Sequence, residues 1–124
     1  MWIFTKDGYF SAVQKDCNAD EVLVRSRQKS DLVSLGKKIG IKLRLRETPL
    51  SDYRYRTVLK KADWGRYLAE AALNLDYDNF KDTVPKSDFR RHGAYLQCWE
   101  ALLQWQESSR KGNARNDLSG LMIR

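Results

Sequence analysis

Residues 21–46 read EVLVRSRQKSDLVSLGKKIGIKLRLR, and this stretch decides the predicted fold. Its first part, residues 21–27, is rich in Val and Leu and is typical of a strand. A short helix follows, with Ser30 as its N-cap and Gly40 just past its end. Apolar and basic residues then alternate strictly over 41–46, which predicts a half-buried strand with a basic outer face. The predicted order is therefore strand, helix, strand.

The segment that follows adds a further strand and helix. Residues 53–60 alternate again, and this pattern places Tyr53 on the face opposite Arg54. From Asp63 the apolar residues recur at helical spacing as far as Leu75, which indicates an amphipathic helix. The order from residue 21 to 75 resembles part of a ferredoxin-like split βαβ unit that lacks its last strand.

A hairpin at the N-terminus can supply the missing strand. Residues 2–5 and 9–14 are rich in aromatic and β-branched residues, and Lys6-Asp7-Gly8 between them is a hairpin turn signal. The three apolar residues in a row at 2–4 predict a strand that is covered on both faces. The fold class is therefore α+β: an antiparallel sheet of about five strands packed by two or three helices.

The C-terminal part of the sequence predicts one more helix and a tail. The helix runs from residue 88 to 107 with Ser87 as its N-cap. Residues 107–124 are polar and aperiodic, which predicts a flexible tail. We therefore expect a single domain over residues 1–106.

Composition restricts the class of protein. The chain has 124 residues, of which 42% are hydrophobic, enough for one core. No segment is apolar for long enough to span a membrane, and the first residues do not resemble an export signal. Cys17 and Cys98 are far apart in the sequence, so we expect two free thiols and a cytoplasmic protein. No motif calls for a cofactor.

The positive charge lies mainly in the first half of the chain. The formal net charge is +7, and residues 1–60 hold +6 of it. Such an asymmetry favours a partner with negative charge, either nucleic acid or an acidic protein surface. Eight basic residues in or beside predicted strands are candidates for nucleic-acid binding: Arg25, Arg27, Lys42, Arg44, Arg46, Arg54, Arg56 and Lys60. The alternative is a merely solvated sheet face.

Signals for catalysis are weak. Asp76, Asp78 and Asp82 have oxygen ligands that suit Mg²⁺, and with a basic surface they suggest a metal-dependent nuclease. A loop with turn-forming residues is the better interpretation, because the spacing fits no known metal motif. His92 is the only histidine and falls on an apolar stripe. We therefore predict a protein that is not an enzyme and holds no metal.

Two binding functions remain. The first is a non-enzymatic protein whose basic sheet face engages nucleic acid, either RNA or single strands. The alternative is a small interaction or inhibitor protein, of the kind by which a mobile element blocks a host defence complex. Trp105 lies off the main apolar stripe of the last helix and is a candidate contact for a partner protein or a homodimer.

Several segments resemble a group of small bacterial proteins of unassigned function. The resemblance covers about residues 1–106. It lies in the segments MWIFT (1–5), GYFSAV (8–13), LVRSR (23–27), DYRYR (52–56) and YDNFK (77–81). It implies one compact domain and transfers no catalytic residue to this chain.

Overall fold

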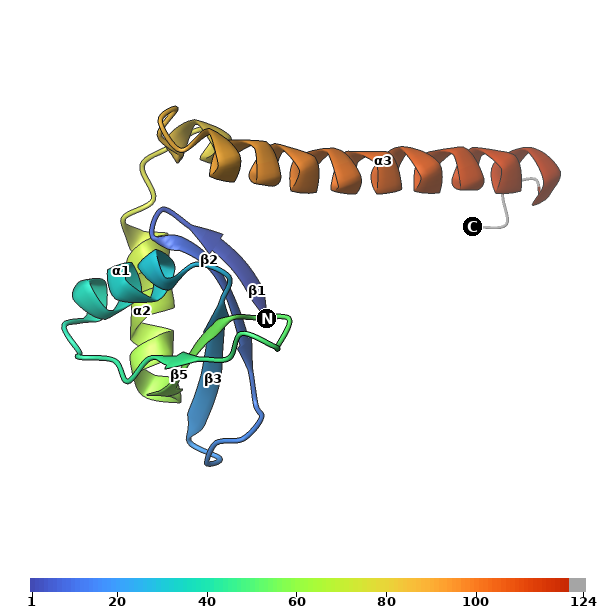
Figure 1. Cartoon of the computed structure of the whole chain (residues 1–124). Helices are drawn as coiled ribbons and strands as arrows, with labels where there is room; N and C mark the ends of the chain where they lie inside the picture. The colour runs from blue at the N-terminus through green and yellow to red at the C-terminus, as the bar shows by residue number, and fades with distance from the viewer. Residues whose placement is uncertain (121–124) are drawn as a thin grey trace. The chain divides into compact units, whose positions relative to one another are not determined.

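The computed structural model describes the backbone of residues 1–120 and the side chains of residues 1–112 (Figure 1). The chain divides into two compact units, Met1–Asp76 and Tyr77–Arg124.

The first unit is an antiparallel sheet of five strands with two helices, which confirms the predicted α+β class. The strand order is β1-β2-β3-β5-β4. The elements are β1 (Trp2–Thr5), β2 (Gly8–Val13), β3 (Glu21–Ser26), α1 (Lys29–Ile39), β4 (Arg46–Glu47), β5 (Tyr55–Lys60) and α2 (Lys61–Leu73).

The β1–β2 hairpin forms where the sequence predicts it. Thr5 pairs with Gly8, so Lys6 and Asp7 make the two-residue turn. Gly8 has a φ of +142°, and a Cβ built there would lie 2.2 Å from the side chain of Asp31 in α1. The Asp31 carboxylate accepts a hydrogen bond from the backbone N–H of Tyr9 at 3.0 Å. Glycine is therefore required where the hairpin meets α1.

The strand order confirms the split βαβ interpretation. Strand β5 pairs antiparallel with both β3 and β4, so β3 and β4 run parallel with β5 between them. Strand β2 occupies the other side of β3, also antiparallel. The N-terminal hairpin therefore takes the place that the missing last strand would fill.

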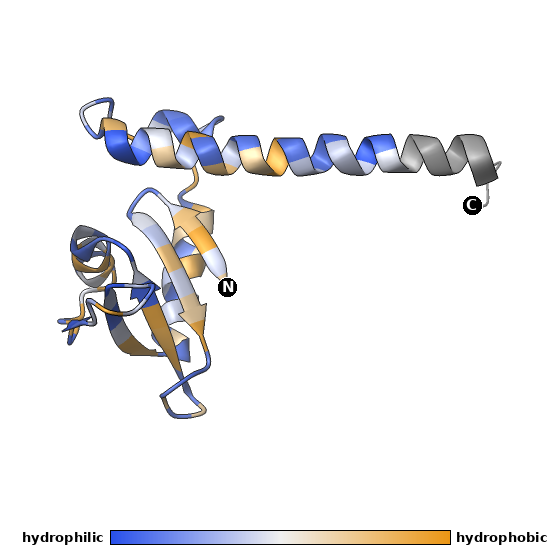
Figure 2. Ribbon diagram, turned by 45° about the vertical axis from the view of Figure 1, so that its right-hand side comes forward, coloured by the Kyte–Doolittle hydropathy of each residue, from blue (hydrophilic) through white to orange (hydrophobic). Residues whose placement is uncertain are grey.

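Helices α1 and α2 lie on the same face of the sheet (Figure 1) and enclose the core with it. In Figure 2 the strands carry long apolar stretches, whereas the loops are mainly hydrophilic. The rings of Trp64 and Tyr67 stack with centroids 5.6 Å apart, and Phe10 meets both of them edge-on. The buried core residues are Phe10, Ala12, Val24, Leu32, Leu35, Ile39, Leu59, Trp64 and Tyr67.

The hydroxyl of Tyr67 links α2 to the hairpin. It donates to Asp7 Oδ2 at 2.7 Å and lies 2.7 Å from the Thr5 hydroxyl. Burial raises the pKa of Tyr67 well above its usual value, and the hydrogen bond to Asp7 acts in the same direction.

Between β3 and β5, two details of the sequence prediction are wrong. Residues 41–45 form no ladder, and β4 consists of Arg46 and Glu47 alone. The alternation there arises because Ile41, Leu43 and Leu45 pack against the core while the residues between them face solvent. Helix α1 begins after Gln28, without a side-chain cap, so Ser30 is not the N-cap. Gly40 does end the helix, with a φ of 71°.

The second unit contains a short 3₁₀ helix, η1 (Phe80–Thr83), and the long helix α3 (Phe89–Gly120). Asp88, not Ser87, caps α3: its Oδ1 accepts from the Arg91 N–H at 3.2 Å, and its Oδ2 accepts from the Arg91 side chain at 3.1 Å. The stacked rings of Phe80 and Tyr95 join η1 to the helix.

Helix α3 extends beyond the point where the sequence analysis expects a tail from residue 107. Gln104–Gly120 contains no proline, and Glu107 and Arg110 form an ion pair one turn apart at 3.3 Å. The helix therefore includes residues 107–120, and residues 121–124 of the expected tail lie outside the described residues.

Candidate nucleic-acid interface

A single row of paired residues crosses all the strands of the sheet. Trp2 pairs with Ser11, Ser11 with Arg25, Arg25 with Arg56, and Arg56 with Arg46. Directly paired residues in a sheet share a face, so these five side chains lie on one side. Five neighbouring strands span about 20 Å in this direction.

The row lies on the face of the sheet that α1 and α2 do not cover. The residues next to it along the strands, such as Phe10, Val24 and Thr57, are buried, and the first two belong to the core. Because successive side chains in a strand point to opposite faces, Ser11, Arg25 and Arg56 point away from the helices.

A buried tyrosine organises the arginines on this face. Tyr53 is only 4% exposed, and the guanidinium carbons of Arg25 and Arg27 lie 4.6 and 4.2 Å from the centroid of its ring. The Tyr53 carbonyl oxygen accepts a hydrogen bond from Arg56 Nη2 at 3.3 Å. We call this surface the arginine face and define it by Arg25, Arg27, Arg46, Tyr53 and Arg56.

The arginines of this face are held by neutral groups. Arg25 donates to the Ser11 hydroxyl at 2.9 Å, Arg27 to the Asp52 carbonyl oxygen at 2.6 Å, and Arg56 to the Thr48 hydroxyl at 3.1 Å. Within the described part of the chain, no carboxylate forms an ion pair with Arg25, Arg27, Arg46 or Arg56.

Carboxylates of the described chain therefore do not neutralise the charge on the arginine face. Arg56 is only 9% exposed, and the buried Nε of Arg25 has no hydrogen-bond partner. Like charges placed directly across strands destabilise a sheet by about 0.2–1 kcal/mol for each pair. A buried cation without an anionic partner adds a further cost, which a bound anion would offset.

Aromatic rings continue the face towards β1. Phe4 and Tyr9 pack with centroids 4.6 Å apart, and the Tyr9 hydroxyl lies 3.0 Å from that of Tyr53. Trp2 is 76% exposed and Phe4 is 36% exposed. The prediction that this strand is covered on both faces is therefore wrong: β1 is an edge strand whose outer side chains reach solvent.

The structure brings together four of the eight basic residues that the sequence singled out, namely those of the arginine face. Arg54 and Lys60 instead form ion pairs, with Glu47 at 3.1 Å and with Asp20 at 2.8 Å. Lys42 and Arg44 are exposed on the segment between α1 and β4, outside the ladder.

Tyr53 is the residue that sequence reasoning misplaced. The alternation in 53–60 put it opposite the arginines, but β5 begins only at Tyr55. The residues before β5 form a turn, in which the Thr48 N–H donates to the Arg54 carbonyl oxygen at 2.6 Å. The turn signal Pro49–Asp52 was the available indication that the period of two does not extend back to Tyr53.

The other residues that the sequence analysis singled out are the carboxylates near Asp76, His92 and Trp105. Asp76 forms an ion pair with Lys6, and the described residues contain no group of three or more His, Cys, Asp or Glu side chains that could hold a metal ion. His92 is half-buried on α3, and Trp105 on the same helix is 68% exposed. Among the helices of the described chain, none is both long and apolar enough to cross a membrane.

Comparison with known proteins finds no relative of this chain. No protein-family model, no curated protein and no solved structure matches the chain.

Proposed function

We propose that this protein binds single-stranded nucleic acid on the arginine face. The observation that carries the proposal is the row across the sheet, which joins an exposed tryptophan, Trp2, to three arginines in register. None of those arginines is neutralised by a carboxylate of the described chain.

The order of groups along the row suits an unpaired strand better than a duplex. Guanidinium groups bind phosphates, and exposed aromatic rings stack on bases that have no partner. A row of about 20 Å corresponds to the short end of the site sizes known for single-strand binders, about four nucleotides. In a duplex the bases are already stacked, so Trp2 would have no base to contact.

Binding can be measured by fluorescence anisotropy with labelled single-stranded RNA, single-stranded DNA and duplex DNA at several salt concentrations. We expect the single strands to bind more tightly, with an affinity that falls steeply as salt rises. Replacing Arg27 and Arg46 by Gln should lower the salt slope by about 1.4, since each phosphate contact on a single strand contributes about 0.7. Trp2→Ala should weaken binding without changing the slope.

The double variant Lys37→Gln/Lys38→Gln is the matched control. It removes the same charge from α1, which lies on the other face of the sheet, and both lysines are exposed. If this control lowers the affinity and the salt slope as much as the arginine variant does, net charge alone governs binding and the proposed site is wrong. Salt-independent binding, or none, would also contradict it.

A protein partner is the second candidate function, and one observation favours it. Helix α3 exposes large apolar side chains, which an arginine face for nucleic acid does not require.

A further inference from the structure

The segment between α1 and β4 lies at the edge of the sheet (Figure 1) and has the side-chain pattern of a strand. Its three apolar side chains pack against the core, and the basic side chains that alternate with them are exposed. A period of two is that of an extended chain. We call residues 41–47 the basic edge, after its exposed residues Lys42, Arg44 and Arg46.

Contacts with α1 hold the basic edge in position. The Ile41 N–H donates to the Gly36 carbonyl oxygen at 3.1 Å. A Cβ built on Gly36 would lie 3.1 Å from the Ile41 carbonyl oxygen and 3.2 Å from Leu43 Cγ, so a glycine lets the segment approach the helix closely. The segment is therefore fixed by packing before a partner arrives, which lowers the entropy cost of binding.

The main chain of residues 42–45 has no partner. Within the part of the chain that the structure describes, no hydrogen bond involves the N–H or carbonyl groups of these four residues. Strand β4, which follows them, is the last strand of the sheet, so one side of its backbone is open as well. Unpaired N–H and carbonyl groups at the edge of a sheet are a template for pairing with another strand.

We propose that the basic edge binds an extended segment of a partner protein in which acidic and apolar residues alternate. The bound segment adds a sixth strand to the sheet of five. In this mode of recognition, main-chain hydrogen bonds supply affinity and alternate side chains supply specificity. The proposal does not depend on nucleic-acid binding.

The charges of the basic edge select the acidic residues of the partner. No carboxylate of the described residues forms an ion pair with Lys42, Arg44 or Arg46. Opposite charges that face each other across paired strands stabilise a sheet, whereas like charges destabilise it. A second copy of this segment would place basic residues beside basic residues, so the pattern opposes pairing between copies.

A groove beside the segment accepts the apolar residues of the partner. It has a volume of about 370 Å³ and lies between α1 and the basic edge; its apolar lining consists of Leu32, Val33, Ile41, Leu43 and Leu45. Val33 is 40% exposed. Successive side chains of an added strand point to opposite faces. A strand whose acidic residues lie beside the three basic residues therefore presents the residues between them to the groove.

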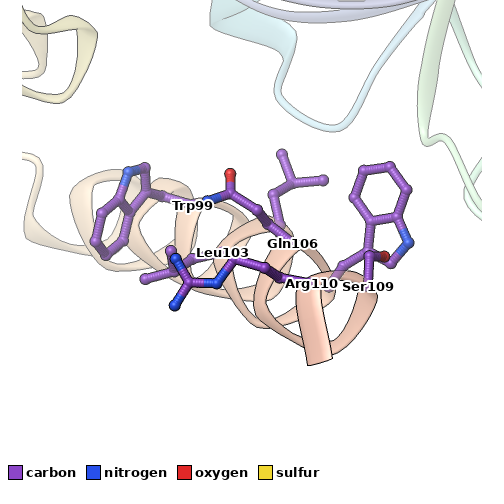
Figure 3. A pocket seen from close by; sticks show the side chains of 7 residues that line it. Trp99, Leu103, Gln106, Ser109 and Arg110 are labelled. Carbon is purple, nitrogen blue, oxygen red and sulfur yellow. The ribbon is translucent and has the colours of Figure 1, made fainter. Parts of the chain in front are cut away.

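The apolar side chains of α3 offer no comparable surface. Figure 3 shows side chains such as Trp99, Leu103 and Gln106 leaving this helix in several directions. Leu103 and Trp105 are two residues apart, which is about 200° around a helix. A helix also uses its main-chain groups internally, so it cannot pair with a strand as the basic edge can.

Hydrogen exchange on the full chain tests the pairing, with the synthetic peptide acetyl-EVEVEVE-amide as the probe. In the free chain the amides of residues 42–45 should exchange at unprotected rates, because they have no acceptor. With the peptide at about ten times its dissociation constant, alternate amides within 42–46 should exchange about tenfold more slowly. Protection confined to β1, the other edge of the sheet, would overturn the proposal.

Fluorescence anisotropy with labelled peptides tests the charge pattern. The peptide EEEEVVV has the same composition and charge as EVEVEVE but does not alternate, and it should bind at least about tenfold more weakly. Lys42→Glu/Arg44→Glu should weaken EVEVEVE at least about tenfold, and this variant should bind KVKVKVK instead. Both positions are exposed, and urea unfolding checks that the variant still folds.

Lys15→Glu/Lys61→Glu is the matched control. It makes the same change in net charge at two exposed positions of the first unit, outside the basic edge. It should change the affinity for EVEVEVE by less than about threefold, because exposed charges at a distance are screened by salt. A loss as large as that of Lys42→Glu/Arg44→Glu would show that net charge alone attracts the peptide.

Three further results would overturn the proposal. The first is equal binding of EVEVEVE and EEEEVVV. The second is the absence of binding at millimolar peptide. The third is a Lys42→Glu/Arg44→Glu chain that loses oligonucleotide binding and keeps its affinity for EVEVEVE, because these residues would then belong to the nucleic-acid site.

Discussion

The ring of Tyr53 contacts two guanidinium groups, and its carbonyl oxygen accepts a hydrogen bond from a third. A single side chain thus fixes the positions of Arg25 and Arg27. Long cationic side chains lose much conformational freedom when they bind a ligand, and part of that cost is already met when a ring holds them. The arginine face is therefore prepared for an anion before one arrives.

Two substitutions at Tyr53 separate its ring from its hydroxyl. Tyr53→Phe removes only the contact with the Tyr9 hydroxyl, so we expect a loss of about 1 kcal/mol in stability and little change in oligonucleotide affinity. Tyr53→Leu also removes the ring beneath both arginines and should cost about 3 kcal/mol. It should weaken oligonucleotide binding severalfold. Urea unfolding and anisotropy measure the two effects; equal binding by both variants would contradict the role of the ring.

Tyr67 contributes stability to the fold that is lost at alkaline pH. Burial, followed by the hydrogen bond to Asp7, raises the pKa of Tyr67 above its usual 10.0. A raised pKa means that the neutral hydroxyl stabilises the fold fully below pH 10, and that this stability is lost as pH rises above 10. Tyr67→Phe removes the hydrogen bonds to Asp7 and Thr5 and should be less stable than the native chain at pH 8. Because the hydroxyl ionises at high pH, the difference should shrink by pH 11.5. Urea unfolding across this range tests it; a constant difference would contradict it.

At the scale of the element, helix α3 depends on its cap at Asp88. The carboxylate accepts from the Arg91 N–H and pairs with the Arg91 side chain, and these bonds lower the pKa of Asp88. Asp88→Ala should fray the first turn and lower the thermal stability of the helix, whereas Asp88→Asn keeps a good cap and should lower it less. A lowered pKa also means that the cap weakens as pH falls below 3.8. Helical circular dichroism during thermal unfolding measures both variants, and equal losses would show that the cap is not the cause.

An element could be predicted where the residue pattern marks both its beginning and its end. The N-terminal hairpin and the five-strand topology could be predicted because a turn signal and a change of period mark each boundary. Residues 41–45 show why alternation alone is insufficient. Their apolar side chains pack on the core at a period of two, yet the backbone makes no ladder. Burial on one side produces the same pattern as a strand.

The candidate site was only partly predictable, for a different reason. The register that aligns Arg25, Arg56 and Arg46 is a property of the paired strands, and no single segment contains it. Sequence reasoning therefore included these arginines but could not separate them from Arg54 and Lys60, whose carboxylate partners lie close to them only in the folded chain. The position of the Tyr53 ring could not be predicted for the same reason, because a turn places it.

At the scale of the whole molecule, the proposed nucleic-acid site belongs to one of the two compact units. The arginine face lies entirely within residues 1–76. Every residue of the buried core cluster falls between Phe10 and Tyr67, so this cluster is formed within the first unit. A unit that owns its core can fold alone.

A fragment of residues 1–76 should therefore unfold cooperatively in urea and bind single strands as the full chain does. Trp64, which is 4% exposed, reports its unfolding by fluorescence, and exposed Trp2 is the only other tryptophan in the fragment. A folded fragment that fails to bind would place part of the nucleic-acid site in the second unit. A fragment without a cooperative transition would show that the sheet needs residues beyond Asp76, because the core described above would then be insufficient to hold it.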